Sequence, residues 1–205
     1  MTIPTFPARP VSGGPFPKAR EKIGQWIYEP KFNGWRALVH IETGTMFNRK
    51  GERLSINGEF KEALTLLRGT LDAAAFKWAD VEALERRHGI GQGCLIMLDV
   101  IPEPDYAKMA YSERRRWLQP VLPALDCFVP SWSFDRSDDR AFPLLSMPAA
   151  VAPTSAWTEL QRANKILGCQ FYEGLVAKRQ DSTYPIQLRS ADEEYPFWIK
   201  HRWSF

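Results

Sequence analysis

The feature that most constrains the fold is the run CLIMLDVI at residues 94–101, in which Asp99 is the only polar residue. Its length suits one strand. A strand with almost no alternation of polar and apolar residues must be covered on both faces. The chain is therefore expected to fold in layers, with this strand inside a sheet and other elements packed above and below it.

The remaining segments predict a mixture of short strands and helices. A helix is expected over residues 55–69, with Asn57 as its N-cap and Gly69 as its stop. Strands and helices do not alternate strictly, so the pattern favours an α+β fold over a doubly wound parallel sheet. Further helices are expected over residues 112–125 and 155–167, and strands over residues 35–40, 45–49, 76–84, 171–178 and 197–203.

The start of the chain is rich in proline, which is unfavourable inside helices and sheets. Residues 1–25 are therefore expected to form an extended arm, and residues 26–205 the folded domain. Residues 128–153, rich in Pro, Ser and Asp, are expected to form a connecting loop.

Composition excludes several classes of protein. A hydrophobic content of 44% excludes a disordered chain, and no apolar run approaches the roughly 18 residues of a membrane span. The start of the chain lacks the apolar region of a secretion signal. Cys94, Cys127 and Cys169 are spaced neither as a disulfide framework nor as a metal site. A reduced cytoplasmic protein without a membrane partner is expected, and the net charge of +3 alone says nothing about nucleic acid.

Two segments place charged groups at the ends or faces of expected strands. Lys31 precedes a tight turn expected at residues 33–34, where a rigid loop can hold its amine at the mouth of a sheet. Asp80 and Glu82 are two residues apart on an expected strand, so they share a face and can hold a hard cation such as Mg²⁺. Taken singly, each is more typical of a solvated turn or strand edge.

Two further segments lie near the end of the chain. Residues 173–178, EGLVAK, contain a glycine inside an expected strand, which often marks the close approach of a ligand or backbone. Lys200 and Arg202 share one face of the last expected strand, as they would on a basic edge strand.

In order and spacing these segments resemble the covalent nucleotidyltransferase superfamily and, within it, the ATP-dependent DNA ligases. The resemblance covers residues 26–203. The matching segments are residues 31–36 (KFNGWR, for KxDGxR), 47–51 (FNRKG, for S-R-x-G), 80–82 (DVE, for DGE), 95–99 (LIMLD, for FxxFD), 111–115 (YSERR, for Y-x-x-R-R), 173–178 (EGLVAK, for EGxxxK), 181–184 (DSTY, for D-S-x-Y) and 198–202 (WIKHR, for WxKxK).

The resemblance implies antiparallel sheets packed with flanking helices, an ATP-grasp-like nucleotidyltransferase domain with a central nucleotide cleft. It implies that Lys31 attacks the α-phosphate of ATP to form lysyl-AMP. The AMP then passes to the 5′-phosphate of a DNA nick, and the 3′-hydroxyl displaces it. A free lysine, with a pKa of about 10.4, must lose its proton to attack, and neighbouring cations favour that loss. Such an enzyme would serve DNA repair, replication or recombination.

The resemblance also assigns the remaining site residues. Glu29 would read the adenine amino edge, Leu95 and Val176 would lie on the two faces of the base, and Arg36 and Arg49 would contact ribose and phosphates. Mg²⁺ would be held by Glu82 and Glu173. The full set of implied ATP-binding residues is Glu29, Arg36, Arg49, Glu82, Leu95, Val176, Lys178, Arg189 and Lys200.

Three departures from the family pattern bear on activity. Asn33 replaces the aspartate of KxDGxR and so lacks its charge. Leu95 offers no π-stacking where the family usually has an aromatic. No residues are left after Phe205 for the OB-fold domain that clamps DNA in family ligases, so a protein that supplies an OB-fold or DNA clamp is an expected partner of an otherwise monomeric chain.

Two alternatives to a DNA ligase stay open. One is another enzyme of the superfamily, an RNA ligase or a capping-type guanylyltransferase. The other is a non-catalytic or partner-dependent module that binds nucleotide or nicked DNA, which Asn33 and the absent OB-fold support. The intact residues Lys31, Glu173, Lys178 and Lys200 favour an enzyme.

Overall fold

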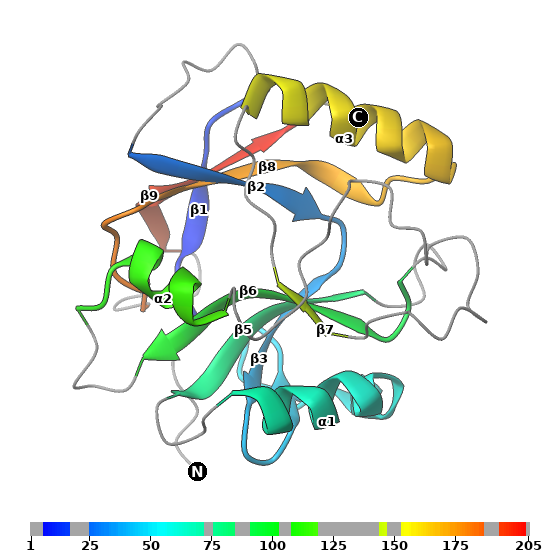
Figure 1. The fold of residues 1–205 in the computed structure, drawn as a ribbon, viewed down its shortest axis with the longest axis vertical. Helices are drawn as coiled ribbons and strands as arrows, with labels where there is room; N and C mark the ends of the chain where they lie inside the picture. The colour runs from blue at the N-terminus through cyan, green and yellow to red at the C-terminus, as the bar shows by residue number, and fades with distance from the viewer. Residues whose placement is uncertain are drawn as a thin grey trace.

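Two sheets lie face to face, with one long helix outside each (Figure 1). The structure is a computed structural model that describes residues 6–16, 25–71, 76–84, 91–102, 108–118, 144–146, 153–186 and 193–203. The expected helix beyond residue 118 and most of the expected loop 128–153 lie outside these residues. The predicted α+β class with facing, mainly antiparallel sheets is confirmed.

The five-stranded sheet has the order β4-β3-β5-β6-β7. The run 94–101 forms β6, in the sheet interior between β5 and β7, and Leu95, Ile96 and Met97 have no exposed surface. The apolar faces of β3, β5 and β6 pack against α1. The prediction of a strand covered on both faces is confirmed. The bounds are β3 Trp35–His40, β4 Thr45–Phe47, β5 Phe76–Leu84, β6 Cys94–Pro102, β7 Leu144–Ser146 and α1 Lys61–Thr70.

The four-stranded sheet has the order β1-β9-β8-β2. Leu175 and Ala177 of β8 pack with Trp157 and Leu160 of α3, which covers this sheet (Figure 1). Gly168 ends α3 with a φ of +66°, as a glycine stop should. The bounds are β1 Arg9–Ser12, β2 Trp26–Phe32, β8 Tyr172–Arg179, β9 Glu194–Arg202 and α3 Pro153–Leu167.

The first predicted helix is correct in place but not in its cap. A 3₁₀ turn, Ser55–Phe60, precedes α1, so Asn57 lies within this turn rather than at a helix start. The Asn57 side-chain amide donates instead to the carbonyl of Gly44, at 3.1 Å. The polar residue therefore ties the 3₁₀ turn to the β3–β4 connection.

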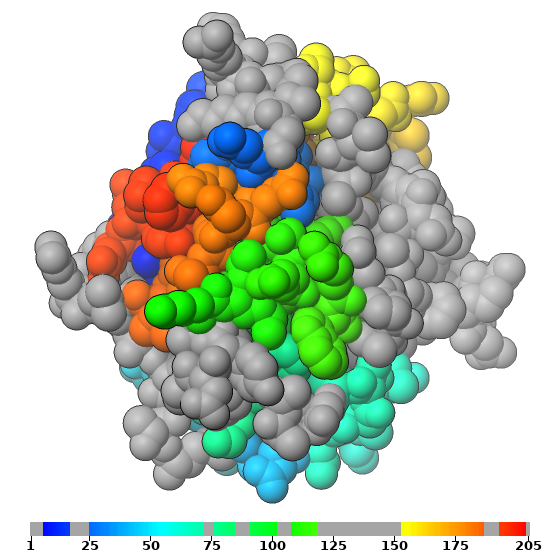
Figure 2. Space-filling view, turned by 60° about the vertical axis from the view of Figure 1, so that its left-hand side comes forward, coloured from blue at the N-terminus to red at the C-terminus, as the bar shows by residue number. Residues whose placement is uncertain are grey.

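A short helix, α2 (Tyr111–Leu118), contacts both sheets, through β6 and through the residues that follow β8. Figure 2 shows it, in green, against the orange β8 segment. Backbone hydrogen bonds from Tyr111 to Ser182 and from Ser112 to Gln180 hold its start there. Among the described residues, no helix is both long and apolar enough to cross a membrane.

Part of the proline-rich start of the chain belongs to a sheet. Residues Arg9–Ser12 form β1, which pairs parallel to β9. Proline is tolerated on an edge strand because one side of such a strand needs no ladder hydrogen bond. Part of the expected arm is therefore an edge strand of the domain's own sheet.

Candidate active site

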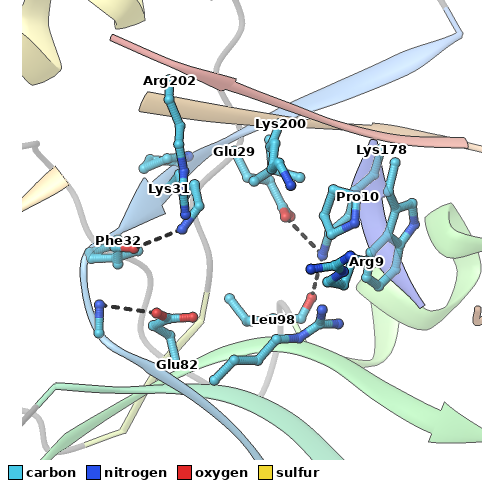
Figure 3. A pocket seen from close by; sticks show the side chains of 15 residues that line it. Arg9, Pro10, Glu29, Lys31, Phe32, Glu82, Leu98, Lys178, Lys200 and Arg202 are labelled. Atoms are coloured by element: carbon cyan, nitrogen blue, oxygen red, sulfur yellow. Dashed lines mark hydrogen bonds and ion pairs between the residues drawn. The ribbon is translucent and has the colours of Figure 1, made fainter. Parts of the chain in front are cut away.

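A cavity of about 260 Å³ lies between the two sheets (Figure 3). Strands of both sheets supply its walls, and the basic side chains in them outnumber the acidic ones. Such a cavity suits a polyanionic ligand with an apolar part. Its lining residues are Arg9, Pro10, Glu29, Pro30, Lys31, Phe32, Gly34, Arg36, Glu82, Leu98, Val176, Lys178, Trp198, Lys200 and Arg202.

Lys31 lies near the end of β2, just before the chain crosses from one sheet to the other. Its amine is 2.6 Å from a carboxylate oxygen of Glu173, which also lies 2.9 Å from the guanidinium of Arg202. The side chains of Lys31 and Glu173 keep 19% and 15% of their surface exposed. The amine is therefore positioned by ionic contact yet accessible from the cavity.

The chain crosses between sheets at Asn33 and Gly34 rather than forming a hairpin, since β2 and β3 belong to different sheets. A Cβ at Gly34 would lie 2.6 Å from the carbonyl oxygen of Ala83, so only glycine fits this crossing. The Gly34 amide donates to the Glu82 carboxylate at 3.0 Å. This crossing therefore fixes Lys31 and Glu82 relative to each other.

The side-chain amide of Asn33 donates a hydrogen bond that an aspartate carboxylate could not donate. Its Nδ2 donates to the Gln170 carbonyl at 3.0 Å, and its backbone amide donates to Phe171 at 3.0 Å. These bonds tie the crossing to the turn after α3. The substitution that the family pattern flags thus has a structural role here.

We therefore expect Asn33→Asp to slow, by several-fold, the covalent nucleotide transfer that the family resemblance implies. The new carboxylate would face the Gln170 carbonyl without a donor, at a cost of about 1–2 kcal/mol. Single-turnover transfer from labelled ATP would measure the effect, with Asn33→Ala as the uncharged control. A faster Asn33→Asp variant would show that the missing charge matters more than the lost hydrogen bond.

Glu173 contacts Lys31 at an irregularity in β8. In a regular strand it would share the face of Leu175 and Ala177, which pack beneath α3. Gly174 has a φ of +144°, and the β2–β8 register shifts between Lys31 and Phe32. This local distortion accompanies the turn of the Glu173 carboxylate toward Lys31.

The two carboxylates of β5 have different roles. Asp80 is fully buried and bonded to both Nε and Nη2 of Arg36, at 2.9 and 2.6 Å, and it accepts a hydrogen bond from Tyr184 at 3.0 Å. Glu82 instead faces the cavity. The sequence-based idea that the two together hold a cation is therefore wrong, because Asp80 already pairs with Arg36.

Local electrostatics shift two of these groups. Burial raises the pKa of Glu82 above its ordinary value, Lys31 and Arg36 oppose the rise, and Glu173 adds to it. Burial alone would lower the pKa of Arg36, but the charge and hydrogen bonds of Asp80 outweigh it, so that pKa is raised. Arg36 is thus a permanent cation in the cavity wall.

Glu29 is buried and held by three donors. Tyr111 donates to its Oε1, Arg115 lies 2.5 Å from the same oxygen, and the Lys178 amine lies 3.0 Å from Oε2. Lys178 also donates to the Leu98 carbonyl at 2.9 Å. Glu29 and Lys178 both line the cavity, but each has a fixed place in a network with α2.

A second buried pair fixes α2 itself. Arg114 donates through Nε and Nη2 to the two oxygens of Asp99, at 2.8 and 2.9 Å, and both residues have no exposed surface. Asp99, the one polar residue of the run 94–101, therefore anchors α2 to β6. Paired buried charges of this kind hold a geometry even where they add little net stability.

The open wall of the cavity carries a group of cations. Burial lowers the pKa of Lys200, and the charge of Arg202 lowers it further. Glu194 opposes this, and Arg9 and Lys31 each add a smaller lowering effect on that pKa. Concentrated positive charge favours an anionic ligand and a neutral amine.

Most predicted site residues come together, since seven line the cavity and Glu173 contacts Lys31 beside it. Two do not join them, and a third is not among the described residues. Leu95 is buried in the core against α1, and Leu98 lines the cavity in its place. Arg49 is exposed in the turn after β4 and does not line the cavity. Arg189 lies outside the described residues. Those that do line the cavity are Glu29, Lys31, Arg36, Glu82, Val176, Lys178 and Lys200.

No metal cage is preformed in the described part of the chain, where no three His, Cys, Asp or Glu side chains group to hold an ion. Glu82 and Glu173 are close enough to interact electrostatically beside Lys31. Two carboxylates with phosphate oxygens suit Mg²⁺, which binds few protein ligands and keeps waters. The donor set therefore fits Mg²⁺ only in company with a phosphate ligand.

Sequence reasoning missed the contribution of β1, which brings Arg9 and Pro10 into the cavity wall. It also gave the Tyr111–Arg115 segment no role at the site. A helix was expected here, but the only signal for its role at the site was its match to a family pattern, and β1 had no signal.

Comparison with known proteins supports this description. No family model matches the sequence. The multifunctional non-homologous end joining protein LigD of Mycobacterium bovis is 24% identical over 196 residues, which cover 88% of this chain and 22% of LigD. The LigD proteins of Mycobacterium tuberculosis match with the same identity and coverage.

Solved structures share the fold. The ligase domain of M. tuberculosis LigD superposes with a TM-score of 0.59 at 18% identity, covering 96% of this chain and 59% of that one. Chlorella virus DNA ligase-adenylate gives a TM-score of 0.50 at 12% identity, covering 96% and 69%. An archaeal ATP-dependent RNA ligase gives 0.52 at 14% identity, covering 96% and 48%.

The chain therefore has the fold of the nucleotidyltransferase domain of ATP-dependent ligases, and the predicted resemblance to ligase adenylation domains is confirmed at the level of fold. Within that class it is similar to LigD in both sequence and structure, although it spans only 22% of the length of LigD.

Proposed function

We propose that this chain is the adenylation domain of an ATP-dependent DNA ligase in which Lys31 carries AMP as a covalent intermediate. The observation that carries the proposal is the Lys31 amine, accessible in a cation-rich cavity and held 2.6 Å from Glu173. The match to LigD, a DNA end-joining protein, favours DNA as the substrate.

The proposed first step forms a bond from the Lys31 nitrogen to the α-phosphorus of ATP and breaks the bond to the bridging oxygen of pyrophosphate. The amine must give up a proton, and the Glu173 oxygen at 2.6 Å is within reach to take it. Lys200 and Arg202 would balance the phosphate charge that develops.

Other residues of the cavity would orient the nucleotide. Val176 and Leu98 supply apolar surface for the base, and Glu29, fixed by α2, presents its carboxylate edge beside them. Arg36 would contact ribose or phosphate. Mg²⁺ held between Glu82, Glu173 and phosphate oxygens would supply further countercharge.

The second and third steps would transfer AMP to a 5′-phosphate and seal the nick with the 3′-hydroxyl. Because the chain spans 59% of the LigD ligase-domain structure, its grip on nicked duplex DNA is itself a proposal. A protein partner that supplies an OB-fold or DNA clamp is likewise part of the proposal. An RNA ligase is the second candidate, favoured by the archaeal RNA ligase among the structural neighbours.

Incubation of the wild-type chain with α-labelled ATP and Mg²⁺, followed by denaturing mass spectrometry, tests the proposal. We expect one AMP per chain, mapped to the peptide that contains Lys31. GTP should not replace ATP, since GTP transfer would indicate a capping-type enzyme.

Sealing of a pre-adenylated nick distinguishes the remaining candidate functions. Sealing of DNA but not RNA nicks supports the proposed substrate, and the reverse result supports the RNA ligase. If the chain forms no adduct and seals no nick, an autonomous ligase is refuted and a nucleotide-binding module remains.

A further inference from the structure

The segment of residues 6–12 reaches the cavity from outside every motif that suggested a function. Its strand β1 lies at the edge of the four-stranded sheet, yet Arg9 and Pro10 both line the cavity. Figure 3 shows Arg9 beside Pro10 on the wall that Lys178 and Lys200 share.

Backbone hydrogen bonds fix this segment at three points. The amide of Ala8 donates to Pro185 at 2.7 Å, that of Arg9 to Glu193 at 2.8 Å, and that of Gly13 to Lys200 at 2.9 Å. The Arg9 backbone is therefore held on the strand that carries Lys200.

The other end of the segment packs against the opposite sheet. Phe6 is 7% exposed and belongs to a cluster with Leu38 of β3 and Trp78 of β5. The guanidinium carbon of Arg36 lies 5.4 Å from the ring centroids of both Phe6 and Trp198. Residues 6–12 thus connect the two sheets along one side of the cavity.

The pairing of β1 with β9 is interrupted beside the cavity. Pro10 pairs with Tyr195, but the next residue, Val11, pairs with Ile199. Pro196, in the skipped part of β9, has no amide to donate. The skipped part also contains Trp198, whose side chain lines the cavity. Irregularities of this kind often redirect side chains next to functional sites.

Arg9 shares the cavity wall with Lys178, Lys200 and Arg202. Its charge is close enough to lower the pKa of Lys200, although Glu194 raises that pKa by more than Arg9 lowers it. Like charges gathered in a cavity wall repel one another, and a bound polyanion relieves that repulsion.

We propose that residues 6–12 complete the nucleotide site and that Arg9, together with Lys200, binds phosphate oxygens of ATP. The guanidinium suits this role because its fork of N–H donors matches phosphate geometry. The inference rests on the proposed function for the identity of the nucleotide, but its chemistry concerns the polyphosphate alone.

Calorimetric titration without metal tests this role with three ligands: ATP, inorganic tripolyphosphate and adenosine. We expect Arg9→Ala to weaken ATP and tripolyphosphate about tenfold while adenosine binding is unchanged, and Arg9→Lys to lie between. Arg162→Ala on the outer face of α3, where the side chain is 71% exposed, is the matched control and should bind like wild type. Unchanged ATP affinity in Arg9→Ala, or an equal loss for adenosine, would overturn the proposal.

The same titrations separate this proposal from the ligase itself. A wild-type chain that binds ATP but forms no AMP adduct, and loses tripolyphosphate binding in Arg9→Ala, would refute the ligase and keep the role of Arg9. Normal adduct formation with unchanged affinity in Arg9→Ala would refute Arg9 alone. A wild-type chain that binds neither ATP nor tripolyphosphate would refute both.

Discussion

Lys31→Ala should abolish the covalent AMP adduct, because it removes the cavity amine that is accessible and lies 2.6 Å from Glu173. The loss should exceed a thousandfold in single-turnover transfer, the scale expected when a nucleophile is removed. Glu173 keeps Arg202 at 2.9 Å, so the unfolding free energy should change by no more than about 1 kcal/mol.

Lys31→Arg is the sharper variant of this test. Arginine keeps the positive charge beside Glu173 but stays protonated, so it cannot act as the nucleophile. ATP binding should survive while the adduct is lost. The matched control is Lys61→Ala at the exposed start of α1, which should form the adduct at the wild-type rate. An adduct on Lys31→Arg would place the nucleophile elsewhere.

The sequence signals located the strands that carry the motif residues, but the roles of these residues remain predictions. Lys31, Glu82 and Lys200 lie on different strands, and their common cavity could be inferred only through the resemblance. Periodicity predicted β6 and α3 correctly. It could not say which sheet each strand joins, because β2 and β3 are adjacent in sequence but pair in different sheets.

Leu95 shows where local pattern stops being informative. In the run 94–101, apolar residues occupy both faces, so nothing in the sequence says which face meets the cavity. The strand pairing settles it: Glu82, which faces the cavity, pairs with Ile96, and Leu95, which pairs with Ala83, faces the opposite side toward α1. As a result Leu98, not Leu95, lines the cavity.

The partners of Glu29 were beyond sequence reasoning for a different reason. Tyr111 and Arg115 are more than 80 residues away from it in the chain. Their side chains reach it only because Asp99 and Arg114 anchor α2 on β6. Burial raises the pKa of Tyr111 well above its ordinary value, and the adjacent Glu29 carboxylate raises it further, so the phenol stays a hydrogen-bond donor.

Gly174→Ala should be the most destabilising single-methyl change in the site. A Cβ there would lie 1.9 Å from the backbone oxygen of His201, and the φ of +144° is one that other residues rarely adopt. Neither obstacle can be relieved by moving a flexible side chain, since both belong to the backbone of β8 and β9. Strain and overpacking together should cost at least about 3 kcal/mol, or a melting-temperature drop of about 10 °C.

Gly168→Ala is the matched control for this prediction. Gly168 also has a positive φ, +66°, but nothing lies within 4 Å of its would-be Cβ, so the cost should be only about 1 kcal/mol. Thermal and urea unfolding of the two variants would measure the difference. Because Gly174 also sets the direction of Glu173, any folded Gly174→Ala should lose adduct formation more than Gly168→Ala does. Equal stability of the two variants would contradict the close contact of β8 and β9 beside Lys31.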